Sequence, residues 1–199
     1  MKKSVLIMML LLVCIGVNAE SAKSILDKAA ATVSNPNGVQ ANFQMMSKQY
    51  GSTSGTISIK GRKFHASTPQ AIVWFDGKTQ WTYMKNNDEV NVSNPTEEEL
   101  QAINPYNFIN IYKKGFKLSS KKVNNSYEVH LKATDKKRKI QEMYIIVDQQ
   151  SYRPTHVKMY QNGKWSVLLI SSLKSTSISD DLFQFNAKDF PQAEIIDLR

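Results

Sequence analysis

Most of the chain alternates between apolar and polar residues with a period of two, the pattern of β-strands that bury one face. Short turns such as Asp76-Gly77 and Asn162-Gly163 separate the alternating segments. The predicted strands are 39–47, 55–66, 71–75, 79–84, 117–122, 127–133, 140–147, 155–161 and 165–173, with Val90 and Val92 beside the 71–84 hairpin. Strands in series with short turns predict one antiparallel meander curled into a barrel or half-barrel.

Two segments show helical spacing instead. The first is 21–34, which Ser21 can cap and which ends at Asn35-Pro36. Its apolar residues recur on one helical face: Ile25, Leu26, Ala29, Ala30 and Val33. The second helix begins at Thr96, which forms a capping box with Glu99. Pro105 breaks it, and 106–112 continues as an apolar segment that is either helical or irregular.

Residues 1–19 have the three parts of a secretory signal peptide. Lys2 and Lys3 precede an apolar stretch, and Ala19 supplies a small residue at the cleavage position before Glu20. The stretch is shorter than the roughly 20 residues that a membrane-spanning helix needs. We therefore expect cleavage after Ala19 and export to the periplasm. Residues 20–199 then form a single domain, because no linker or repeat divides them.

The single cysteine and the net charge bear on whether the protein carries a lipid anchor and on which partners it binds. The single cysteine, Cys14, follows Val13 inside the apolar stretch, so we do not expect it to carry a lipid anchor. Loss of Lys2 and Lys3 lowers the formal charge from +9 to +7. The basic runs are 113–114, 121–122 and 136–139, and they fall in predicted turns or, for 121–122, at the end of a predicted strand that leads into a turn. Solvated turn residues explain them most simply; attraction to an anionic membrane or an acidic partner is the alternative. Nothing resembles a nucleic-acid-binding motif.

The chain offers little for catalysis or metal binding. Each of His65, His130 and His156 falls in a predicted strand without a second ligand at metal-binding spacing. No Gly-x-Ser-x-Gly elbow, phosphate-binding loop or His-Glu-x-x-His helix occurs. Asp180-Asp181 reads as a turn or helix start before Leu182. We therefore expect no enzyme, no metal and no cofactor; an enzyme acting on lipids or glycans would need a nucleophile and base that the sequence does not reveal.

Large aromatic residues cluster on the 71–84 hairpin, namely Trp74, Phe75, Trp81 and Tyr83. Strand alternation places Trp81 and Tyr83 on one face and Thr82 on the other. Rings gathered on one sheet face either fill a core or line an apolar pocket. The residue pattern alone leaves both possibilities open.

The same hairpin resembles a known family. Residues 74–83 are similar to the Asp-Gly-Lys-Thr-x-Trp-x-Tyr hairpin of the periplasmic outer-membrane lipoprotein carriers, usually called LolA. Residues 55–60 resemble the family's Gly-x-Φ-x-Φ-Lys strand, where Φ is apolar, and Phe64 and Pro69 match an aromatic residue and a proline before the hairpin. The tail segments 182–185 and 195–197 resemble the family's closing Phe-x-Phe strand and terminus.

This resemblance implies a mainly β fold of class α+β, a strongly curved antiparallel half-barrel lidded by helices around an apolar cavity. Such carriers are monomers that take acylated lipoproteins from an inner-membrane exporter to an outer-membrane acceptor. Each buried CH₂ contributes about 0.8 kcal/mol, so acyl chains must be shielded from water. The implied lipid-cavity residues are Phe64, Trp74, Phe75, Trp81 and Tyr83 on the sheet, with Ile25, Leu26 and Phe108 on the lid.

The sequence departs from the family at one position. Carriers commonly place an arginine directly after the lysine of the Gly-x-Φ-x-Φ-Lys strand, where it holds the lid closed. Here Gly61 takes that place and Arg62 follows, so Arg62 is either the lid latch or a solvent-facing residue. Other lipid- or glycolipid-binding modules share the half-barrel. One of them is the lipid-sensing domain of an envelope-stress regulator, so a role without lipoprotein transfer also stays open.

Overall fold

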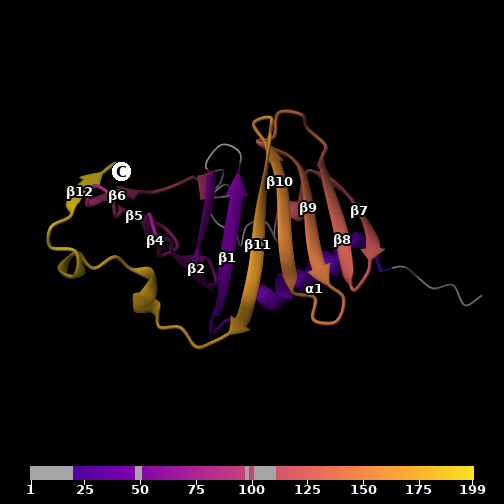
Figure 1. The fold of residues 1–199 in the computed structure, drawn as a ribbon, viewed down its shortest axis with the longest axis horizontal. Coiled ribbons are helices and arrows are strands. Elements are labelled where there is room, and N and C mark those ends of the chain that lie inside the picture. Colours follow the sequence, from indigo (N-terminus) through magenta and orange to yellow (C-terminus); the bar gives the residue numbers. More distant parts are fainter. Residues whose placement is uncertain (1–19, 48–50, 97–98, 101–110) are drawn as a thin grey trace, which may run out of the picture.

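The computed structural model describes residues 20–47, 51–96, 99–100 and 111–199. Twelve strands of this part of the chain form one open sheet in the order β12-β6-β5-β4-β3-β2-β1-β11-β10-β9-β8-β7 (Figure 1). The strands are β1 Val39–Ser47, β2 Gly51–Lys60, β3 Lys63–Ser67, β4 Ala71–Phe75, β5 Gln80–Met84, β6 Glu89–Ser93, β7 Phe116–Val123, β8 Ser126–Ala133, β9 Ile140–Asp148, β10 Pro154–Gln161, β11 Lys164–Ser175 and β12 Glu194–Asp197.

The expectation of one continuous meander needs correction. Strands β1–β6 form one meander and β7–β11 a second, and β11 returns to pair with β1 in the middle of the sheet. Every pairing is antiparallel except that of β12 with β6, which is parallel. Antiparallel strands can follow each other through tight turns, whereas the long connection from β6 to β7 joins two distant parts of the sheet.

The predicted strand 55–66 is in fact two strands. Gly61 and Arg62 form a two-residue turn in which Gly61 has a φ of 58°, and Lys60 pairs with Lys63 across it. A hairpin with such a short turn needs left-handed backbone, which glycine adopts without steric cost. The predicted Asp76-Gly77 turn is confirmed. The Asp76 carboxylate accepts the backbone N–H groups of Lys78 and Thr79 at 2.8 and 2.7 Å.

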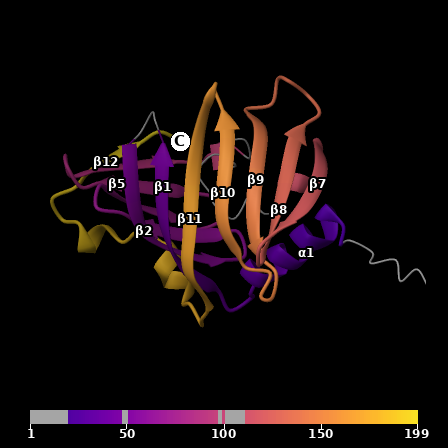
Figure 2. The ribbon, with the colours of Figure 1, turned by 45° about the vertical axis from the view of Figure 1, so that its right-hand side comes forward.

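The sheet twists strongly and curves around the face that carries the helix α1, Ala22–Val33 (Figure 2). A β-bulge in β11 lies opposite β1, and Ser172 adopts a φ of 54° there. Bulges bend a strand and increase its twist, which helps a wide sheet to curve. We call the face that carries α1 the inner face and the opposite one the outer face.

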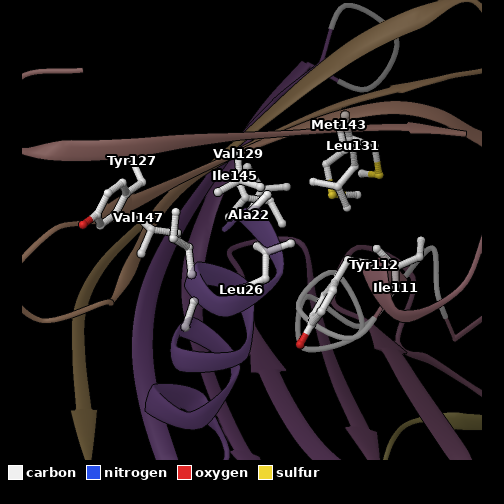
Figure 3. Close-up of a cluster of buried hydrophobic side chains, with 14 of the residues drawn as sticks. Ala22, Leu26, Ile111, Tyr112, Tyr127, Val129, Leu131, Met143, Ile145 and Val147 are labelled. Carbon is white, nitrogen blue, oxygen red and sulfur yellow. The ribbon is translucent and has the colours of Figure 1, made fainter. Parts of the chain in front are cut away.

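Helix α1 forms where the periodicity predicts it. The Ser21 hydroxyl caps its start by accepting the N–H of Ser24 at 3.1 Å. The helix lies across β7 and β8 and buries its apolar side against them. Figure 3 shows Leu26 among the inner-face side chains of β8 and β9. This contact builds the larger of the two main hydrophobic clusters.

A second cluster lies on the inner face of β1–β4 and includes Ile57, Ile59, Phe64 and Phe75. Phe43 packs against both clusters, as does Ile170. The inner face is therefore one continuous apolar surface from β8 to β4.

The C-terminal strap, residues 176–193, crosses the outer face of β3–β5. It contains the 3₁₀ turns η3, Asp180–Phe183, and η4, Ala187–Asp189, and leads into β12. The Asp180 carboxylate lies 3.1 Å from the Lys60 ammonium and 3.2 Å from that of Lys63, which holds the strap to the β2–β3 hairpin. The predicted closing strand at 182–185 is thus wrong, because Ser179 caps a 3₁₀ turn there. The turn or helix start predicted at Asp180-Asp181 takes the form of this 3₁₀ turn.

Candidate functional site on the inner face

The β1–β4 half of the inner face is lined by side chains that strand register brings side by side. Ile59 pairs with Phe64, and Phe64 pairs with Phe75 on the next strand. The two rings lie 5.4 Å apart between centroids, an attractive tilted arrangement. Among the described residues of this cluster, Leu100 alone comes from outside the strands. The cluster is apolar and buried, and Gln80, which pairs with Phe75, borders it on β5.

The β7–β10 half is already covered by α1. Ile25 and Leu26 are both fully buried, and they belong to the same cluster as Leu131 and Met143. At the C-terminal end of the helix, Ala30 and Val33 pack against Leu173 of β11. Helix α1 therefore borders the β1–β4 half of the inner face.

Polar contacts hold α1 in place. The Glu20 carboxylate lies 2.7 Å from the Lys28 ammonium and accepts a hydrogen bond from the Tyr152 hydroxyl at 2.8 Å. These partners, Lys28 first among them, hold the pKa of Glu20 at about 2. On the next turns, Asp27 accepts a hydrogen bond from the hydroxyl of Tyr112, which belongs to η2, Ile111–Lys113. Burial, aided by that bond, raises the pKa of Tyr112. The helix is thus tied to both β9–β10 and η2.

The structure divides the predicted lipid-cavity residues between the two faces. Phe64 and Phe75 lie on the inner face with Ile25 and Leu26. Trp74, Trp81 and Tyr83 instead lie on the outer face, where Trp74 pairs with Trp81. Adjacent strand residues point to opposite faces, so Trp74 and Phe75 cannot share one. Contact of any of these residues with lipid stays a prediction.

The C-terminal strap covers part of this outer aromatic group. The Phe190 ring lies 5.5 Å from that of Trp74 and 4.6 Å from that of Tyr83 between centroids. Phe185 adds a further edge contact to Trp74 at 5.5 Å, and Phe183 of the strap is fully buried. Packing therefore accounts for Trp74 and Tyr83. The sequence signal that could have indicated this covering segment is the Phe-x-Phe spacing of residues 183–185.

Arg62 and Phe108 are the two remaining predicted site residues. Arg62 is exposed in the β2–β3 turn, at the sheet end where Gly38 leads into β1. Its role as a lid latch stays a prediction. Phe108 lies outside the described residues. Inner-face residues that the sequence analysis did not select include Ile57, Ile59 and Val73, although their alternation with polar neighbours is visible in the sequence.

Two of the three histidines, His65 and His130, pack against aromatic rings, and His156 is exposed. Burial lowers the pKa of His65, whose ring lies 5.7 Å from that of Trp74. His130 stacks on Tyr144 at 4.5 Å and lies 2.7 Å from the Glu142 carboxylate. No group of three or more metal-ligand side chains occurs among the residues that the structure describes. The same residues include no helix long and apolar enough to cross a membrane.

Solved structures of other proteins are similar to this fold. An uncharacterized conserved protein from Thermus thermophilus has a TM-score of 0.61 at 14% identity, over 89% of this chain and 99% of that one. A LolA superfamily protein from Nitrosomonas europaea has a TM-score of 0.45 at 15% identity, covering 84% and 99% of the two chains. A putative outer membrane lipoprotein-sorting protein domain from Vibrio parahaemolyticus has a TM-score of 0.47 at 15% identity, covering 82% and 96%. No curated protein matches the sequence.

The open sheet, curved around α1 with an apolar inner face, defines the fold class as mainly β. The family described as "Outer membrane lipoprotein carrier protein LolA" matches residues 12–164. The chain belongs to this family, and the resemblance seen in its hairpin is confirmed. Members of the family are carrier or binding proteins rather than enzymes.

Proposed function

We propose that this protein is a periplasmic carrier that shields the acyl chains of lipoproteins and ferries them from the inner to the outer membrane. The observation that supports this most is the continuous apolar inner face, on which Phe43 and Ile170 connect the cluster under α1 with the cluster on β1–β4. Ile57, Phe64 and Phe75 are buried in this structure, so an acyl chain could lie along them only after the contacts that bury them open. Each CH₂ of the chain that is then removed from water would contribute about 0.8 kcal/mol.

Helix α1 supplies the movable part of the proposed site. Its fully buried Leu26 competes for the same inner face that the cargo would occupy. Its polar ties through Glu20 and Asp27 must open when the helix moves away, and they re-form when it returns. Binding and release then require only an exchange of apolar contacts and no covalent chemistry. An inner-membrane exporter and an outer-membrane acceptor are the partners that such a carrier requires.

Native mass spectrometry of the protein purified from its own envelope fraction tests this function. We expect a bound species whose mass corresponds to an acylated lipoprotein or peptide. A glycolipid or free lipid in its place would favour a lipid-binding module without lipoprotein transfer. Protein that carries no lipid and binds no fatty-acid probe would contradict both the lipoprotein-carrier function and the lipid-binding function without transfer. N-terminal sequencing of the same sample tests export, and the expected first residue is Glu20.

A further inference from the structure

Two basic segments that are separate in the sequence meet at one end of the sheet. The connection between β8 and β9 lies beside the turn that leads into β7, where the Thr134 N–H donates to the Gly115 carbonyl at 3.0 Å. The Arg138 guanidinium packs over the Phe116 ring, 4.6 Å from its centroid. These contacts fix the β8–β9 connection, which projects beyond the strand ends in Figure 2.

The β10–β11 hairpin adds to the same end. Ile140, at the start of β9, pairs with Gln161, which itself pairs with Lys164. We call the cationic residues brought together here the basic rim, which consists of Lys114, Lys136, Lys137, Arg138, Lys139 and Lys164. Five of the six are exposed, and Arg138 is half-buried.

Among the residues that the structure describes, few carboxylates lie beside these cations. Asp135 lies in the same connection, and its side chain accepts the N–H of Lys137 at 2.8 Å. Glu99 is a second carboxylate in the described part of the chain; hydrogen bonds from Thr96, aided by the charge of Lys139, lower its pKa. Within the described part of the chain, cations therefore outnumber carboxylates at the basic rim, and such an excess attracts anionic surfaces and is screened by salt.

Exposed aromatic and apolar side chains lie next to the basic rim on the outer face. Trp165 opens β11 and is 41% exposed, with its ring 5.2 Å from that of Tyr160 and 5.9 Å from that of Tyr144. Met46 is 38% exposed and pairs with Val167, two residues along β11. A shallow pocket of about 410 Å³ lies beside Trp165, lined by Glu128, Tyr144, Lys158, Trp165 and Val167.

We propose that the basic rim and the Trp165 surface dock this protein on an anionic phospholipid membrane. Lysine and arginine near a bilayer are attracted to anionic headgroups, and Trp and Tyr side chains favour the membrane–water interface. The basic rim supplies the first group and Trp165 with its tyrosine neighbours the second, at the same end of the sheet. This docking site is separate from the inner face and does not rest on the carrier function.

Co-sedimentation with vesicles tests the proposal. Wild-type protein should sediment with vesicles of phosphatidylethanolamine and phosphatidylglycerol at low salt, and much less at high salt or with phosphatidylcholine alone. Replacing Lys114, Lys136 and Lys137 with Gln should weaken binding roughly tenfold to a hundredfold. Replacing Lys78, Lys174 and Lys188 with Gln removes the same charge from exposed positions elsewhere and should have little effect.

A second measurement addresses Trp165. Vesicles with brominated acyl chains should quench the fluorescence of the wild type and of Trp81→Phe, but much less that of Trp165→Phe. The proposal is overturned if the wild type does not bind anionic vesicles at low salt, if neutral vesicles bind it equally, or if both triple variants lose binding alike. Binding to polyglutamate without binding to vesicles would assign the basic rim to an acidic protein and also overturn it. Fatty-acid probe binding, measured in parallel, reports on the carrier function independently.

Discussion

Trp74 and Phe75 are neighbours in β4, yet they contribute to opposite faces of the sheet. Phe75 packs on Phe64 at the inner face, whereas Trp74 packs on Phe185 of the C-terminal strap at the outer face. The two faces are covered by different parts of the chain, α1 on one side and the C-terminal strap on the other. Stability of the outer face and ligand binding at the inner face should therefore respond to different substitutions.

The first prediction concerns the C-terminal strap. Phe183 is fully buried, so Phe183→Ala should lower the free energy of unfolding by roughly 3–5 kcal/mol through lost burial and the cavity that remains. Leu182, its neighbour, is 38% exposed, and Leu182→Ala should cost less than about 1 kcal/mol. Denaturant unfolding of both variants checks the contrast. Equal losses would mean that the strap does not depend on the Phe183 contact.

The second prediction uses the lowered pKa of Glu20. Its folded-state pKa of about 2 lies below the usual 4.5, so the carboxylate stabilises the fold above pH 4.5 and this contribution is lost as the pH falls toward 2. Glu20→Gln should therefore be less stable than the wild type at neutral pH, and the difference should vanish near pH 2. Urea unfolding across this range measures it, with Glu194→Gln in exposed β12 as the control. A difference that does not change with pH would contradict the ionic role.

The third prediction concerns Arg62 as a latch. If its guanidinium bonds to the carbonyls at the end of α1, Arg62→Leu should speed amide hydrogen exchange in the last turn of the helix about tenfold. Arg62→Lys should restore protection only in part, because an ammonium lacks the planar fork. Exchange measured by mass spectrometry on the three proteins decides the matter. Equal protection in all three would exclude Arg62 as the latch.

Much of the fold could be predicted because hydrophobic periodicity, turn residues and helix caps indicate the same strands and the same helix. Strands β1 and β4 have the predicted bounds, and α1 differs from the prediction by one residue at each end. The split of 55–66 was also visible in principle. Its apolar positions shift from Ile57 and Ile59 to Phe64 and Ala66, and a continuous strand that buries one face cannot change parity in this way.

The sidedness of the hairpin could not be predicted. Alternation shows that Trp81 and Tyr83 share a face, but both faces of β4 and β5 carry apolar side chains. The C-terminal strap that covers the outer face lies about 100 residues away in the sequence. The alternation within a strand does not indicate which distant segment packs on it. Parallel pairing of β12 with β6 depends on the same long-range path.

The central claim, that the inner face binds acyl chains, is tested most directly by a matched pair in β4. Val73 and Ile72 are both half-buried, with Val73 on the inner face and Ile72 on the outer face beside Tyr83. Displacement of a fluorescent fatty-acid probe by lipid is measured for Val73→Asp and Ile72→Asp, with circular dichroism confirming that both variants fold. A carboxylate among acyl chains is strongly unfavourable, so Val73→Asp should weaken probe binding by about tenfold or more, and Ile72→Asp should leave it nearly unchanged. Loss of binding in Ile72→Asp alone, or wild-type affinity in both variants, would contradict the claim.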